Sequence, residues 1–242
     1  MGKIAKKILY TLLFLSLSIL TAFLIYIHFF RPDDGNFSGE WTAQLDMTKQ
    51  AAVTAFIWLQ DIEGVSISLE EVEADMQDLT ISVNMTMEQT GQSGGSFSCA
   101  VQPESYVACD QAAYEAFAAA FRKLTAERLC MAGYTDSADE ESVEALISET
   151  FGMSADSYLR TCAPALLPSL EELQAGYDGS GTYEAADGVL VRQFDREGTT
   201  VTRSEHYIRE DSSLVLSEEM EGNSSDIVPD HYPIIYTLKP SE

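Results

Sequence analysis

The sequence predicts an α+β protein in which an N-terminal transmembrane helix precedes an eight-stranded antiparallel lipocalin-like β-barrel with a large inserted helical segment. The observations behind this prediction are an uncharged apolar run near the N-terminus, period-two alternation at both ends of the remaining chain, and helical periodicity between those ends. With 242 residues, of which 45% are hydrophobic and 22% charged, the chain is long and apolar enough to bury a core.

The apolar run extends from Ile8 to Phe30 without a single Asp, Glu, Lys or Arg. At about 1.5 Å per residue such a helix crosses a hydrocarbon core of about 30 Å. Lys3, Lys6 and Lys7 precede it, so the positive-inside rule places the N-terminus in the cytoplasm and the rest of the chain outside. A cleaved signal peptide is the alternative, but its apolar core is shorter and ends at small residues, which favours an uncleaved anchor.

This topology divides the chain into four predicted parts. They are a cytoplasmic tail (1–7), a transmembrane anchor (8–30), a polar linker (31–36) and an extracytoplasmic domain (37–242) with a helical insertion at about 103–176.

The charge balance excludes one class of partner. The chain has 39 acidic and 14 basic residues, and because all the acidic but only 11 of the basic ones follow Phe30, the ectodomain has a formal charge of −28. Nucleic acid is not an expected partner, since its phosphates reward clustered Lys and Arg. Anionic lipid head groups are repelled in the same way.

The clearest strand is Asp78 to Glu88, where apolar side chains occupy every second position, as in an antiparallel sheet with one face on a core. After the polar turn 90–95, Phe97, Cys99 and Val101 continue the pattern and predict a hairpin. Six further strands are predicted at Gly39–Leu45, Thr182–Ala185, Val189–Phe194, Thr200–Arg209, Leu214–Glu218 and Pro233–Leu238, with an Asp187-Gly188 hairpin turn.

Helices are expected between the strands. The longest covers about Pro103 to Ala132, where apolar residues recur at steps of three and four. Others are predicted at Thr48–Gln60, Leu69–Met76, Asp139–Phe151, and from near Ser154 in a segment disturbed by Pro164 and Pro168.

Three short motifs resemble those of bacterial membrane-anchored lipocalin-like domain proteins. Gly39-Glu40-Trp41 is similar to the Gly-x-Trp of the lipocalin entry strand, and Gly181-Thr182-Tyr183 with Asp187-Gly188-Val189-Leu190 is similar to a G-x-Y, D-G-x-L pattern of the bacterial domains. The closing Tyr232 to Tyr236 segment also fits. The resemblance implies a barrel that carries a helical insertion, and it implies no activity, because these families are largely uncharacterised.

If the barrel has a lumen, its lining would favour an apolar or amphipathic ligand. The favoured alternative is that the same side chains fill the core, as small barrels permit. The candidate lining residues are Trp41, Ala43, Leu79, Ile81, Val83, Met85, Met87, Phe97 and Val101.

Ser93 lies in Gly91-Gln92-Ser93-Gly94-Gly95, which matches the G-x-S-x-G string of hydrolases, and His206 or His231 could complete a triad. A nucleophile elbow joins a strand to a helix, however, whereas this string joins two strands, which favours a hairpin turn. A pair of acidic residues is the other candidate for a hydrolase, although nothing singles out an acid and a base.

No metal or cofactor is predicted. Asp136 to Glu141 lacks the spacing of a calcium loop and fits a capped helix start. Cys99, Cys109, Cys130 and Cys162 lack zinc-ligand spacing and are expected to be either buried thiols or disulfides, with Cys99–Cys109 and Cys130–Cys162 as the first pairings to consider.

These features predict a membrane-anchored extracytoplasmic binding or interaction module, whose partner is a small apolar ligand or an envelope protein. An extracytoplasmic hydrolase that uses Ser93 or a carboxylate pair is the alternative. A sensory subunit is a third hypothesis, and it would need a membrane partner because only seven residues precede Ile8.

Overall fold

The computed structural model describes Thr21 and residues 36–62, 66–134, 139–196, 199–218 and 231–240. The predicted cytoplasmic tail, the linker up to Gly35 and, apart from Thr21, the predicted transmembrane helix lie outside these residues. Within the described ranges, no helix combines the length and the apolar composition that crossing a membrane requires.

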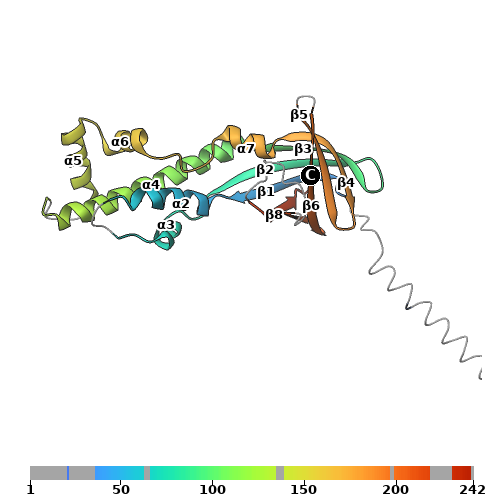
Figure 1. Ribbon diagram of the computed structural model, residues 1–242, viewed down its shortest axis with the longest axis horizontal. Helices are drawn as coiled ribbons and strands as arrows, with labels where there is room; N and C mark the ends of the chain where they lie inside the picture. Colours follow the sequence, from blue (N-terminus) through green and yellow to red (C-terminus); the bar gives the residue numbers. More distant parts are fainter. Residues whose placement is uncertain are drawn as a thin grey trace, which may run out of the picture.

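Eight antiparallel strands form a closed barrel in which each strand pairs with its neighbours in sequence and β8 returns to β1 (Figure 1). This confirms the predicted antiparallel eight-stranded barrel. The strands are β1 (Gly39–Asp46), β2 (Thr80–Gln89), β3 (Gly94–Val101), β4 (Gly179–Ala186), β5 (Val189–Arg196), β6 (Thr199–Glu210), β7 (Ser213–Glu218) and β8 (Ile234–Leu238).

The helices interrupt the strand order at two places. Between β1 and β2 lie α2 (Thr48–Leu59) and α3 (Leu69–Asp75); between β3 and β4 lie α4 (Pro103–Met131), α5 (Glu140–Phe151), α6 (Ala155–Cys162) and α7 (Leu170–Tyr177). The helix expected from Ser154 is thus two helices, because Pro164 and Pro168 lie in the segment between α6 and α7.

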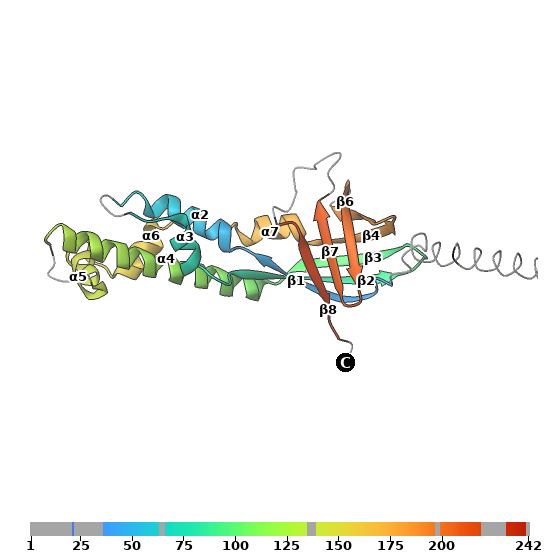
Figure 2. The same ribbon diagram turned by 90° about the horizontal axis from the view of Figure 1, so that it is seen from below.

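Both groups of helices project from the same end of the barrel and form an elongated arm (Figures 1 and 2). The backbone of the arm is α4, whose 29 residues span about 43 Å at about 1.5 Å per residue. Helix α5 crosses the far end of α4, and α6 lies on the way back to the barrel (Figure 1). Since β1 runs toward the arm and continues into α2, its first residue, Gly39, lies at the opposite end of the barrel.

Hydrophobic alternation explains why these strands close into a barrel. Along β2 the side chains of Ile81, Val83, Met85 and Met87 are buried and their neighbours are exposed or half-buried. The turn at Asp187-Gly188 has positive φ at both residues (53° and 79°), as the hairpin prediction requires.

The ladder that closes the barrel is short. Although β1 extends to Asp46, it pairs with β8 only over Trp41, Thr42 and Ala43, which lie opposite Leu238, Thr237 and Tyr236. Beyond Ala43 the pairing between the two strands ends, close to the point where α2 begins.

Candidate functional site: a groove between the barrel and the arm

The barrel interior is packed with side chains. All nine candidate lining residues lie on β1, β2 and β3 or, for Leu79, directly before β2, and none is more than 3% exposed. They belong to one hydrophobic core cluster that also includes Leu190 and Phe194 of β5 and Tyr236 of β8. The favoured interpretation, that these side chains fill a core, agrees with this burial.

A buried ion pair crosses the same interior. Arg192 of β5 and Glu205 of β6 are 2% and 0% exposed, and the guanidinium donates from Nε and Nη2 to the two carboxylate oxygens at 2.8 and 2.6 Å. Tyr232 donates its hydroxyl proton to Glu205 Oε1. Arg192 Nη1 also lies 3.8 Å from Met85 Sδ and 3.6 Å from Cys99 Sγ. The fork of the guanidinium therefore satisfies the carboxylate inside an otherwise apolar core.

The surroundings of the pair shift the pKa values of its neighbours. Burial by itself would lower the pKa of Arg192, but the charges around it, above all Glu205, outweigh burial and raise that pKa. Burial is also the main reason why the pKa of Tyr232 is raised, followed by the nearby negative charge of Glu205. At neutral pH the network therefore holds a cationic Arg192 and a protonated Tyr232.

Sequence reasoning did not identify this network, although one signal was present. Arg192 alternates in phase with Leu190 and Phe194, which places a charged side chain on the inward face of β5. Its partner was harder to find, because the less exposed positions of β6 include several charged side chains, such as Arg203 and Glu205, so hydrophobic alternation does not mark the inward face of this strand.

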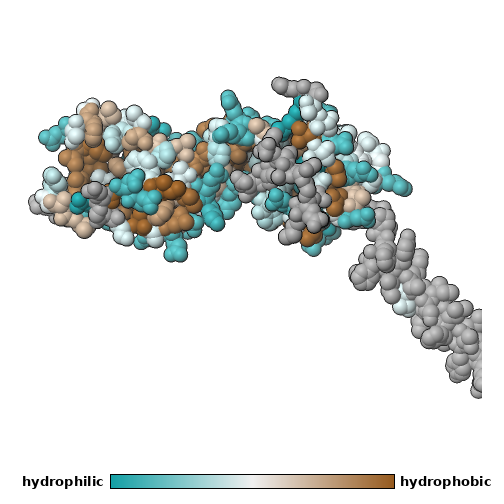
Figure 3. Space-filling view, viewed as in Figure 1, coloured by the Kyte–Doolittle hydropathy of each residue, from teal (hydrophilic) through white to brown (hydrophobic). Residues whose placement is uncertain are grey.

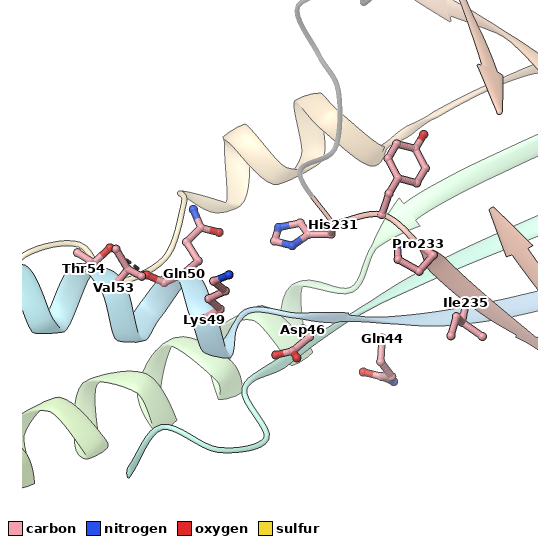
Figure 4. A pocket seen from close by; sticks show the side chains of 10 residues that line it. Gln44, Asp46, Lys49, Gln50, Val53, Thr54, His231, Pro233 and Ile235 are labelled. Atoms are coloured by element: carbon pink, nitrogen blue, oxygen red, sulfur yellow. Dashed lines mark hydrogen bonds between the residues drawn. The ribbon is translucent and has the colours of Figure 1, made fainter. Parts of the chain in front are cut away.

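Tyr232 also belongs to the lining of a groove of about 710 Å³ at the junction of barrel and arm (Figure 4). The groove opens where β1 and β8 stop pairing, between the end of β1, the first half of α2 and the segment that leads into β8. Its lining residues are Gln44, Asp46, Lys49, Gln50, Val53, Thr54, His231, Tyr232, Pro233 and Ile235.

Local structure explains why these residues face the groove. On β1 the inward positions are Trp41, Ala43 and Leu45, so Gln44 and Asp46 point outward. Helix α2 buries its alanine-rich face and Leu59 in the core and presents a second face to the groove. On β8, Ile234 and Tyr236 are buried, which leaves Ile235 on the outer surface, 54% exposed.

The groove combines apolar and charged groups. Val53, Pro233 and Ile235 supply apolar surface, and Asp46 and Lys49 supply opposite charges on either side of the start of α2. The Asp46 carboxylate accepts the Thr48 amide at 2.9 Å and so fixes the turn from β1 into α2. In Figure 4 the imidazole of His231, on the segment before β8, points toward the side chains of Lys49 and Gln50 on α2. Such a surface suits an amphipathic molecule of moderate size.

The structure places Ser93 in the turn of the β2–β3 hairpin, with its carbonyl oxygen accepting the Ala185 amide at 2.6 Å. The G-x-S-x-G string thus joins two strands, as the hairpin prediction states, and Ser93 is exposed there. His206 is exposed on the paired part of β6, opposite Val189 and Ser217, and His231 lies at the groove.

All four cysteines are unpaired thiols, so neither Cys99–Cys109 nor Cys130–Cys162 forms a disulfide in this structure. Burial raises the pKa of Cys99, and burial together with the Asp110 charge raises the pKa of Cys109 to about 11. Both thiols are therefore protonated at neutral pH and unreactive while the protein is folded. Cys130 and Cys162 are only half-buried.

Among the described residues, no three His, Cys, Asp or Glu side chains lie close enough together to hold a metal ion. Asp139 is the N-cap of α5 and accepts the Ser142 amide at 2.8 Å, which is the capped helix start predicted there. Positions 135–138, which include Asp136, lie outside the described residues.

No family model, curated protein or solved structure matches this chain. Function is therefore inferred from the barrel, the arm and the groove.

Proposed function

We propose that the protein is a membrane-anchored extracytoplasmic binding module, in which a lipocalin-like barrel is the rigid base and the groove is the ligand site. The apolar run from Ile8 to Phe30 and the lysines before it support the anchor and its orientation. The Gly-x-Trp entry strand and the closed eight-stranded barrel support the lipocalin-like assignment.

The observation that carries the binding role is an open groove in the described part of the chain, next to a barrel core of buried side chains. The barrel core is filled by buried side chains, whereas a groove of about 710 Å³ lies outside it with apolar and charged groups on its walls. Ligand sites of this size are mostly apolar with a few placed polar groups. The ligand is an amphipathic small molecule that packs on Val53 and Ile235 and directs its polar end toward Asp46 and Lys49.

The Glu205 network gives the groove a fixed wall. Tyr232 lines the groove while its hydroxyl is bonded to a carboxylate that is itself held by Arg192. A preformed wall reduces the ordering that a ligand must impose, which favours binding.

The test uses the full chain, purified from the membranes of the cells that make it into lipid nanodiscs. Small molecules released by denaturation are identified by mass spectrometry. We expect a compound in near-stoichiometric amount with the wild-type chain and at least about tenfold less with Val53→Trp, whose indole fills the groove.

Ile208→Trp is the matched control, because Ile208 is 64% exposed on β6 and outside the groove lining. This variant and the wild-type chain should retain the same amount of compound. The proposal fails if the wild-type chain carries no compound beyond that of empty nanodiscs, or if Val53→Trp retains as much.

A further inference from the structure

The far end of the arm exposes a group of large apolar side chains that the arm does not use for its own core. Figure 3 shows apolar surface over this end, where α5 lies. Met131 and Tyr134 are 72% and 77% exposed, Phe151 is 50% exposed, and Leu146 and Met153 are also exposed. We call these five residues the arm tip. Exposed apolar patches of this kind mark interaction sites on soluble domains.

Helix α5 is attached to the arm mainly by two buried side chains, and the exposed tip residues are not among them. Val143 and Ile147, one turn apart, are buried and attach α5 to the arm. Phe151 stacks one face of its ring on Tyr158, with the ring centroids 4.7 Å apart, and the side chain remains half exposed. Phe151 thus lies one turn beyond Ile147 on the same side of α5 and stays half exposed, whereas Leu146 is exposed on another side of the helix.

At the arm tip, every charged side chain of α5 is negative. This helix carries Glu140, Glu141, Glu144 and Glu149, all exposed, and it contains no Lys or Arg. On the adjoining end of α4, Arg128 is the basic residue of the last turn, and the four glutamates outnumber it. A partner with an anionic rim would therefore meet net repulsion here, whereas Lys or Arg beside an apolar face would be attracted. A second copy of this chain would bring the same glutamates against these, and anionic lipid would be repelled likewise.

The position of the arm tip suits a partner that is not the membrane holding the chain. The tip lies beyond the 29 residues of α4, and Gly39, where the barrel begins, lies at the other end of the molecule (Figures 1 and 2). A chain held through residues that precede Gly39 presents the tip at its most distant point.

We propose that the arm tip docks a partner protein through an amphipathic helix whose apolar face is flanked by Lys and Arg. The apolar side chains of the tip supply the contact area, and the four glutamates of α5 orient the basic flanks. This proposal is independent of the groove, which lies at the opposite end of the arm.

The test measures binding of a fluorescently labelled amphipathic helical peptide of Leu and Lys, of about 18 residues, to the full chain in nanodiscs of zwitterionic lipid. Fluorescence anisotropy should show binding that weakens at higher salt. The double variant Met131→Ser/Tyr134→Ser should weaken it at least about tenfold without a change of charge. Both side chains are largely solvent-exposed, so this variant should fold normally.

Ile208→Ser, which removes an apolar side chain that is 64% exposed on the barrel, is the matched control and should bind like the wild-type chain. A Leu and Glu peptide of the same pattern, and a scrambled Leu and Lys peptide without an apolar face, should bind at least about tenfold more weakly. Phe151→Ser serves as a second tip variant with the same expected loss.

Three results would overturn the proposal. The first is equal binding by the tip variants and Ile208→Ser, which would show that the overall negative charge of the protein attracts the peptide and that the tip is not its binding site. The second is a dimer in sedimentation velocity that the tip variants abolish, which would make a second copy the occupant. The third is binding of the tip to peptide-free zwitterionic vesicles, which would make lipid the occupant.

Discussion

Arg192 and Glu205 are the two charged side chains that are buried among the described residues of the barrel. A buried ion pair contributes little net stability over apolar side chains of similar volume, but loss of one partner leaves a buried charge unpaired. The pair therefore makes the barrel sensitive to single substitutions and tolerant of a matched double one.

We predict that Arg192→Met lowers the free energy of unfolding by about 3–5 kcal/mol, because Glu205 is then buried without its counter-ion. Arg192→Met/Glu205→Leu should recover most of that loss. Urea unfolding gives the free energy of unfolding of both variants. Because the chain has two tryptophans, a Trp58→Phe background leaves Trp41 as the fluorescent reporter of the barrel. A double variant as unstable as the single one would contradict the prediction.

Tyr232 couples this network to alkaline pH. Because burial and then Glu205 raise its pKa in the folded state, the unfolded chain releases this proton first as pH rises above about 10. The stabilisation is complete below that pH and is lost as pH climbs toward the folded-state pKa.

Tyr232→Phe should be about 1–3 kcal/mol less stable than wild type at pH 7, because the Glu205 carboxylate loses a hydrogen bond. Its stability should nevertheless fall less steeply between pH 9.5 and about 11.5. The stability of the variant should still fall somewhat over this pH range, because burial also raises the pKa of Tyr236. Urea unfolding at several pH values gives the two slopes, and identical slopes would exclude Tyr232 as a source.

At the scale of elements, the close approach of β4 to β5 explains Gly181 of the G-x-Y motif. A Cβ at this position would lie 1.8 Å from the carbonyl oxygen of Gln193, so the two backbones leave no room for a side chain. Tyr183, two residues later, points inward and is 4% exposed. The motif is therefore a requirement of barrel geometry.

Gly181→Ala should lower the free energy of unfolding by about 1–3 kcal/mol, because β4 must move away from β5. Gly176→Ala is the matched control, since a Cβ there meets nothing within 4 Å and Ala is favoured inside α7. This control should be as stable as wild type or up to about 1 kcal/mol more stable. Thermal and urea unfolding compare the two variants, and equal stabilities would contradict the prediction.

The elements were largely predictable from the sequence, and the site was not. Period-two alternation, as at Ile81 to Met87, placed the strands, and the Asp187-Gly188 turn was visible as a dipeptide. The groove requires the end of β1, one face of α2 and the start of β8 to meet, which no local pattern encodes. Likewise the pairing of Arg192 with Glu205 depends on the register between β5 and β6.

At the scale of the whole molecule, the way in which the arm is joined to the barrel determines where the arm and the groove lie. Helix α4 begins directly after β3 and α7 ends directly before β4, and these strands are neighbours in the barrel. Asp178 Oδ1 accepts the Val101 amide at 2.6 Å and joins the two points where the chain leaves and re-enters the barrel. The arm is thereby attached to the barrel through adjoining strands, with the groove on the β1 side of the junction.

The three-pair ladder between β1 and β8 also determines the order in which the barrel opens. This ladder joins the first and last strands of the barrel, so forming it closes the longest loop of chain and costs the most conformational entropy. We therefore expect its hydrogen bonds to open at a lower free energy than those of the other ladders. Hydrogen exchange should therefore be faster at the amides of Thr42 and Thr237 than at Arg192 in the longer β5–β6 ladder. Equal exchange rates in the two ladders would show instead that the barrel opens as one unit. A ligand that contacts both α2 and β8 would act as a clasp across this ladder and slow the exchange of its amides.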